Sequence, residues 1–177
     1  MKFFAVDILD RAPYLPEDVD FQRFDCTEGN WPFENETFDA ITAVHLLEHL
    51  RHGGELFNQL KRVLKNGGTC YAEVPGLRRC FVPSFRFVSE PLMPINFFDD
   101  PTHVTIYSME RLFGKFHDAG FRVYKVGIRR NWLMTLLSPL LVGALILLRR
   151  RDLLSWGVQN LLGLNIYSIS NKDEDVS

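Results

Sequence analysis

The distribution of apolar and polar positions along the chain predicts short strands separated by amphipathic helices. Segments enriched in β-branched or aromatic residues, which favour strands, lie at Lys2–Val6, Asp20–Phe24, Phe38–Val44, Thr69–Val74, Phe121–Ile128 and Asn165–Asn171. Strands that alternate with helices are typical of a largely parallel sheet covered by helices. We therefore predict an α/β fold in a single domain over residues 1–172, followed by a polar tail at 173–177.

Two helices are predicted by apolar residues that recur at helical spacing. The first covers Glu55–Lys65 and is stopped by Asn66-Gly67-Gly68, since glycine commonly follows the last helical turn. The second begins at Ser108, a favourable N-cap, and ends at Gly120. The side chains that these helices are expected to bury are Leu56, Leu60, Val63, Leu64, Leu112, Phe113 and Phe116.

The stretch over residues 77–105 is rich in proline and phenylalanine and shows weak periodicity. Loops of this length in a compact domain are usually functional lids or disordered segments. We predict an ordered lid because the stretch carries the aromatic residues Phe81, Phe85, Phe87, Phe97 and Phe98.

Composition and charge exclude several classes of protein. The chain has 177 residues, of which 46% are hydrophobic and 24% are charged, as expected of a globular protein. Its net charge of -2 argues against a nucleic-acid binder, which needs a dominant basic face. The three cysteines Cys26, Cys70 and Cys80 form no CxxC pair, and no signal-peptide core is visible, so we predict a cytoplasmic location.

Acidic residues follow two of the predicted strands. Asp7 comes after the first apolar run, and Asp25 comes directly after Phe24. A carboxylate at the end of such a strand can accept hydrogen bonds from both hydroxyls of a ribose, or from an amino group such as that of adenine. Each residue could equally be a solvated acid that opens a loop, and the residue pattern leaves both interpretations open.

Imidazole side chains follow the third strand in the string His45-x-x-Glu48-His49. On a long helix this string could place two zinc ligands on one face, with Glu48 as the base of an inverted zincin. The string instead begins directly after a strand, Gly53-Gly54 closes the helix early, and no clearly placed acidic third ligand follows. We therefore predict no metal site and keep a zinc hydrolase only as a minor alternative.

His103 lies in the predicted lid, just before the second helix. An imidazole in such a loop can act as a general base near neutral pH. It can also hold the loop by a hydrogen bond to a backbone carbonyl, and we slightly favour this structural role.

Taken together, these segments resemble the class I S-adenosylmethionine-dependent methyltransferases. The match covers residues 3–128 and extends through the final strand to about 172, in the order and spacing of that family. The matching segments are Val6-Asp7-Ile8, Phe24-Asp25-Cys26, residues 31–39, residues 44–50, residues 60–68, Glu73-Val74-Pro75, Asp100-Pro101-Thr102-His103 and Ala119-Gly120-Phe121.

The resemblance implies a Rossmann-like fold, S-adenosylmethionine as the cofactor, and methyl transfer by in-line displacement. By position, Asp7 would bind the cofactor ribose and Ile8 would pack on the adenine. Asp25 and Cys26 would meet the edge of the adenine.

The resemblance also places an acceptor pocket. Val44 and His45 would lie beneath the methionine part of the cofactor, where the acceptor enters. The lid with His103 would shape the rest of the pocket, so His45 and His103 are the candidate catalytic residues.

The chain departs from the family at its N-terminus. The family's first strand and glycine-rich loop, which cradle the methionine end of the cofactor, have no counterpart in this sequence. That strand lies at the centre of the family's sheet, so we expect a gap there. A truncated gene product is our favoured explanation; a segment supplied from elsewhere and a degenerate family member are the alternatives.

The most apolar stretch is residues 132–148, flanked by arginines at 129–130 and 149–151, within a predicted helical insertion over 129–164. A spanning helix needs about 20 apolar residues, and about 17 is the lower limit. Residues 153–164 add an amphipathic pattern. A hairpin in the membrane interface is favoured over helices packed on the domain or on a second subunit, and over a true span.

We therefore predict a methyltransferase that acts on a small or lipid-linked acceptor, in the cytoplasm and at the inner face of the membrane. A catalytically silent module of the same fold, acting as a binding or scaffold protein, is the alternative. No nucleic-acid partner is expected, and a homo-oligomer remains open.

Overall fold

The computed structural model describes residues 2–10, 15–51, 53–83, 85–87, 90–93, 95–130, 132–147, 158–159 and 161–173. With η denoting a 3-10 helix, its elements are β1 (Phe3–Asp7), β2 (Val19–Arg23), β3 (Phe38–Val44), η1 (Leu47–His49), α1 (Gly54–Val63), β4 (Leu64–Pro75), η2 (Leu77–Phe81), β5 (Phe85–Phe87), β6 (Glu90–Met93), η3 (Phe97–Asp99), α2 (Met109–Asp118), β7 (Phe121–Ile128), α3 (Trp132–Leu147) and β8 (Asn165–Lys172).

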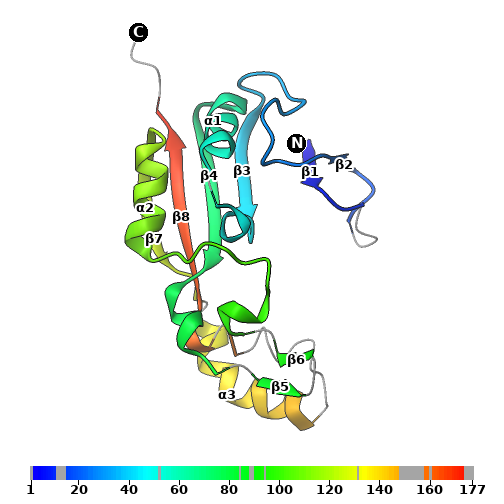
Figure 1. The fold of residues 1–177 in the computed structure, drawn as a ribbon, viewed down its shortest axis with the longest axis vertical. Coiled ribbons are helices and arrows are strands. Elements are labelled where there is room, and N and C mark those ends of the chain that lie inside the picture. The colour runs from blue at the N-terminus through cyan, green and yellow to red at the C-terminus, as the bar shows by residue number, and fades with distance from the viewer. Residues whose placement is uncertain are drawn as a thin grey trace.

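A four-stranded sheet of order β3-β4-β8-β7 forms the centre of the molecule, and β1 and β2 form a separate parallel pair (Figure 1). β3 and β4 are parallel, whereas β8 runs antiparallel to both β4 and β7. The predicted α/β class with a mostly parallel sheet is confirmed, because β3, β4 and β7 run in the same direction and β8 is the reversed strand among them. β8 runs antiparallel to β7 because it starts at the end of the sheet where β7 finishes, so that Ile166 pairs with Ile128.

The β1–β2 pair makes no backbone pairing with β3 in the described part of the chain. Aromatic side chains connect them instead. The ring centroid of Phe4 in β1 lies 5.8 Å from that of Phe33 and 5.4 Å from that of Phe38, the first residue of β3. This interruption between β1 and β3 is consistent with the gap expected from the sequence.

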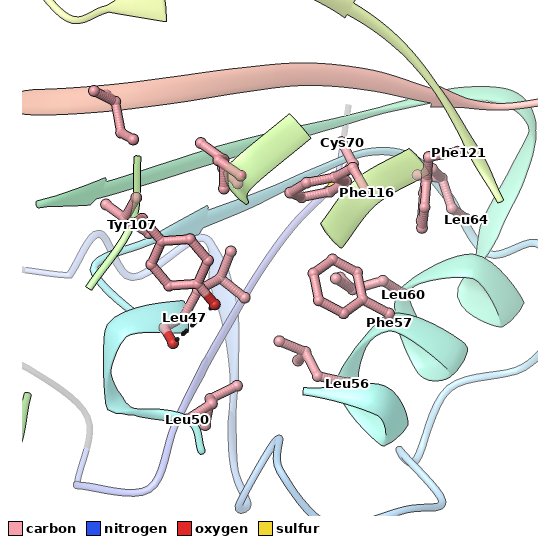
Figure 2. Packing of buried hydrophobic residues seen from close by; sticks show 14 residues of the cluster. Leu47, Leu50, Leu56, Phe57, Leu60, Leu64, Cys70, Tyr107, Phe116 and Phe121 are labelled. Carbon is pink, nitrogen blue, oxygen red and sulfur yellow. Dashed lines mark hydrogen bonds between the residues drawn. The ribbon is translucent and has the colours of Figure 1, made fainter. Parts of the chain in front are cut away.

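The hydrophobic core lies between the central sheet and helices α1 and α2, which cover the same face of the sheet (Figure 2). Phe57 of α1 meets Phe116 of α2 edge-on with ring centroids 5.0 Å apart, and Phe116 lies 5.5 Å from Phe121 of β7. The alternate residues of β4 that face this core are fully buried: Cys70, Ala72 and Val74. Burial raises the pKa of the Cys70 thiol to about 12.

The first predicted helix is present with a shifted end. All four of its predicted core positions are buried, but α1 ends at Val63. The next residue, Leu64, is already extended because it pairs with Phe38 of β3. Gly67 and Gly68 therefore lie within β4 instead of ending the helix.

The second predicted helix, α2, begins as expected. The Ser108 hydroxyl oxygen accepts a hydrogen bond from the backbone N of Arg111 at 3.2 Å. Leu112 and Phe116 are buried, but the predicted burial of Phe113 is wrong, because its side chain is 45% exposed. Phe113 stacks on His117 on the outer side of the helix instead.

The described residues between 77 and 105 form the short elements η2, β5, β6 and η3. The start of this segment is bonded to the residues that follow it, since Leu77 N donates to Tyr107 O at 2.9 Å. The Tyr107 hydroxyl in turn donates to Leu47 O (Figure 2). Phe97 is buried, whereas Phe81 and Phe98 are exposed. The side chains of Phe85 and Phe87 lie outside the described part, so the role of this segment as a lid stays a prediction.

The apolar insertion forms the helix α3, which lies at the opposite end of the molecule from α1 (Figure 1). Its exposed apolar side chains include Trp132, Leu136 and Leu140, at 75%, 69% and 75% exposure. Among the described helices, none has the length and hydrophobicity that a membrane crossing requires. The predicted amphipathic segment at 153–164 lies partly outside the described residues.

Candidate cofactor and acceptor site

The two strand-end acids lie side by side at the end of the β1–β2 pair. Asp7 is the last residue of β1, and its carbonyl oxygen accepts from the backbone N of Phe24 at 3.1 Å. Phe24 directly precedes Asp25, so this bond brings the two acids together. Asp7 Oδ1 accepts from Leu9 N at 2.9 Å, and Asp25 Oδ1 accepts from Thr27 N at 2.8 Å. Because a carboxylate accepts hydrogen bonds at both oxygens, each acid shapes its own turn and retains capacity to accept from a ligand.

Cys26 and Ile8 flank these acids. Burial raises the pKa of the Cys26 thiol, and the negative charges of Asp25 and Asp7 raise it further, so the thiol is protonated at neutral pH. The Cys26 carbonyl accepts from Trp31 Nε1 at 3.0 Å, which ties this turn to the core. Ile8 is 55% exposed and offers an apolar surface beside two carboxylates.

The residue that follows β3, His45, has a strained backbone. His45 directly follows Val44 and has a φ of 53°, a left-handed conformation that residues other than glycine seldom adopt. Its backbone N donates to Glu73 O of β4 at 2.9 Å, so the pairing continues one residue beyond the strand. Val44 and His45 are both exposed at this end of the sheet.

Glu48 is the buried centre of this region. Its side chain is 0% exposed, and its Oε1 accepts from His45 Nδ1 at 3.0 Å. Its Oε2 has no hydrogen-bond partner among the described residues. Burial lowers the pKa of Arg79, and the carboxylates of Glu48 and Asp99 raise it, which places this guanidinium within their electrostatic reach. A buried carboxylate oxygen without a partner is costly, because its desolvation is not offset by a hydrogen bond.

His103 makes the contact expected of its structural role, and its role as a general base stays a prediction. Its Nδ1 lies 2.8 Å from Phe97 O, and since a carbonyl only accepts, Nδ1 carries the hydrogen. The favoured structural role of holding the loop is thus confirmed. In the neutral ring Nε2 then carries the lone pair, and it lies 3.6 Å from Asp100 Oδ2 and 4.0 Å from Glu48 Oε1.

The zinc hydrolase alternative is wrong, because the H-x-x-E-H string does not form the helix that would place His45 and His49 on one face. Only Leu47–His49 form a helical turn, and it is a 3-10 turn. His45 precedes this turn in a left-handed conformation, so it does not share a helix face with His49. Glu48, the base in that interpretation, is fully buried and bonded to His45.

Polar residues of β4 and β8 that the sequence interpretation missed complete this end of the sheet. Glu73, 4% exposed, accepts from Asn165 Nδ2 at 2.9 Å and Tyr71 Oη at 2.8 Å, and pairs with Arg129 Nε at 3.1 Å. Burial, followed by the hydrogen bond to Glu73, raises the pKa of Tyr71 to about 12. Asn165 Nδ2 also lies 3.5 Å from His45 Nε2. The sequence feature that could have pointed to these residues is Glu73 itself, an acid inside an otherwise mostly apolar strand.

The candidate residues thus form two groups, one around Asp7 and Asp25 and the other around Glu48. The turn after β2 reaches the start of α1, since a Cβ on Gly29 would lie 3.8 Å from Glu55 Oε2. The chain enters α1 shortly after the group around Glu48. That both groups line one crevice stays a prediction.

Comparison with known proteins identifies the family. The family model described as "Methyltransferase domain" matches residues 2–126, which is more than half of the chain. No curated protein sequence matches the chain.

Solved structures share the fold at low sequence identity. The complex of the Haloferax volcanii Trm112 methyltransferase activator with a methyltransferase matches with a TM-score of 0.63 and 13% identity, over 97% of this chain and 72% of that chain. A SAM-dependent methyltransferase from Archaeoglobus fulgidus has a TM-score of 0.58 and 19% identity, over 96% and 75%. Phosphoethanolamine N-methyltransferase 2 of Haemonchus contortus, solved with phosphomonomethylethanolamine and S-adenosylhomocysteine, has a TM-score of 0.57 and 14% identity, over 89% and 38%. The predicted Rossmann-like fold is therefore confirmed.

Proposed function

The chain belongs to the class I S-adenosylmethionine-dependent methyltransferases, and we propose that Asp7 and Asp25 hold the adenosyl half of this cofactor. The observation that carries the proposal is the pair of adjacent strand-end carboxylates, each using Oδ1 in its own turn. Their remaining acceptor capacity suits ribose hydroxyls and the adenine amino group. The exposed Ile8 supplies an apolar surface for the purine. These residues fit the group, which when bound supplies an electrophilic methyl on a sulfonium.

The acceptor side of the site is proposed to lie at the end of β3, around His45 and His103. Methyl transfer depends mostly on the alignment of two reactants, and a base is needed only where the acceptor must lose a proton. The lone pair of His103 Nε2 and the exposed ring of His45 are the groups available for that proton. We propose a small or lipid-linked acceptor, and the related phosphoethanolamine enzyme, solved with phosphomonomethylethanolamine, supports the small-molecule class.

Calorimetric titration of the full chain with S-adenosylmethionine tests cofactor binding. We expect one saturable binding event and a rise in the unfolding temperature, because a ligand that binds only the folded state stabilises it. A folded sample that gives neither heat nor a thermal shift would contradict the enzyme proposal. That result would favour a catalytically silent binding or scaffold module.

A second part of the proposal is that α3 attaches the protein to the cytoplasmic face of a membrane. Trp132, Leu136 and Leu140 recur at helical spacing and are largely exposed, and Leu133 and Leu137 widen this apolar face. Contiguous apolar surface of this kind is typical of interaction sites, and a helix lying in the interface plane would bury it. The arginines at 129–130 suit an anionic lipid surface.

Replacing Leu136 and Leu140 together by glutamate is expected to lower binding to phosphatidylserine-containing vesicles by at least about tenfold. Burial of a leucine side chain contributes about 1.5–3 kcal/mol, and each 1.4 kcal/mol corresponds to about tenfold in affinity. Co-sedimentation with vesicles measures the bound fraction.

The matched control for this experiment is Met109→Glu, which changes an exposed apolar residue at the start of α2. We expect it to bind vesicles like the unchanged protein. Equal binding by the Leu136/Leu140 variant would contradict the membrane proposal. A loss of self-association in that variant, without any vesicle binding by the unchanged protein, would assign α3 to a subunit interface instead.

A further inference from the structure

A carboxylate and two imidazoles come together near the end of β3, outside the residues assigned to the cofactor. Glu48, His49 and His103 each offer one ligand atom, and these atoms all lie within 4.8 Å of one another. We propose that these three side chains bind a divalent transition-metal cation of the Zn²⁺ or Co²⁺ type. Imidazole nitrogens favour such borderline cations over Mg²⁺ or Ca²⁺, and a carboxylate completes the set.

The hydrogen bonds around both histidines leave the nitrogen that a metal requires. In His103, Nδ1 donates to Phe97 O, so Nε2 has the lone pair. The Thr102 hydroxyl lies 2.5 Å from Asp100 Oδ1 and donates to it, because a carboxylate can only accept. Thr102 Oγ1 therefore accepts from His49 Nδ1 at 2.9 Å, which leaves the lone pair of His49 on Nε2. Metal-binding histidines usually donate their other N–H to an oxygen in this way.

Burial and charge point to the same ligand. The Glu48 side chain is fully buried, and its Oε2 has no hydrogen-bond partner among the described residues. Asp100 Oδ2 adds a second carboxylate 3.6 Å from His103 Nε2, which also favours a cation at this site.

The spacing needs only a small adjustment of side chains. Zinc binds nitrogen and oxygen at about 2.0–2.2 Å, so neighbouring ligands of a tetrahedral site lie roughly 3.4 Å apart. Glu48 Oε1, which also accepts from His45 Nδ1, lies 4.0 Å from His103 Nε2 without the cation, and the three ligand atoms all lie within 4.8 Å of one another. Three protein ligands leave a coordination position open for water or for an oxygen of the acceptor. In the cation-bound form His103 is a ligand, and His45 is the remaining candidate base.

The test uses the full chain without an affinity tag, stripped with a chelator, and titrated with Co²⁺ in the absence of S-adenosylmethionine. We expect one equivalent of Co²⁺ to bind, with visible ligand-field absorption, and Zn²⁺ to displace it. Glu48→Gln keeps the size of the side chain and should weaken binding by more than about a hundredfold, since the loss of even an outer partner costs about 10–100-fold. His117→Gln, on the exposed side of α2, is the matched control and should bind like the unchanged protein.

Circular dichroism establishes that each variant is folded. If Glu48→Gln does not fold, His49→Gln decides, because His49 is only partly buried and its loss is expected to weaken Co²⁺ binding to a similar extent. The proposal is overturned if the unchanged protein binds neither Co²⁺ nor Zn²⁺, or if a folded Glu48→Gln or His49→Gln variant binds like the unchanged protein. Because no S-adenosylmethionine is present, this outcome is separate from a failure of cofactor binding.

Discussion

Replacing Phe116 by alanine is expected to lower the free energy of unfolding by about 3–5 kcal/mol. The Phe116 ring is 0% exposed and lies between the rings of Phe57 and Phe121. Its removal leaves a cavity where α1, α2 and β7 meet, and it breaks two edge-on aromatic contacts. Total stabilities of single domains are about 5–15 kcal/mol, so the loss is a large fraction of the whole. Urea unfolding followed by circular dichroism measures it.

Phe113→Ala on the same helix is the matched control. Phe113 is 45% exposed and stacks on the exposed His117, so we expect a change below about 1 kcal/mol. The two variants delete the same atoms from the same helix, so the difference between them reports burial alone. Equal destabilisation by both would show that the core does not lie on the Phe116 side of α2.

Asp7→Asn is expected to weaken S-adenosylmethionine binding by about 10–100-fold. A hydrogen bond to a charged group contributes about 1.5–3 kcal/mol, and each 1.4 kcal/mol corresponds to about tenfold in affinity. The asparagine oxygen can still accept from Leu9 N, so the turn after β1 keeps the hydrogen bond that the aspartate makes. The effect therefore reports the lost charge and acceptor capacity rather than a distorted turn, and calorimetric titration measures it.

Asp39→Asn is the control for this experiment. Asp39 is an exposed acid near the start of β3 and pairs with Lys65 on the surface, far along the strand from His45. We expect unchanged cofactor affinity and an unchanged unfolding temperature, since exposed ion pairs contribute little. An Asp7→Asn variant that binds like Asp39→Asn would remove Asp7 from the cofactor site.

The residue pattern along the chain predicted the first and last residues of an element correctly where local residue types alone determine them. β3 and β7 begin and end at the predicted residues, because β-branched and aromatic residues, which favour strands, are enriched over those residues. The end of α1 was missed because Leu64 pairs with Phe38, a contact across the sheet that no local spacing records. The exposure of Phe113 was missed for a related reason, since it depends on which side of α2 the sheet covers.

The sequence by itself determined that acids follow the first two strands, that histidines follow the third, and that their order matches a methyltransferase. Only the tertiary structure decided what surrounds these groups. It brought His103 from residues 77–105 to Glu48, and Asn165 from the last strand to Glu73. Spacing along a chain records the faces of single helices and strands. The partners of a buried charge are set by how distant elements pack, and packing is decided by the whole core at once.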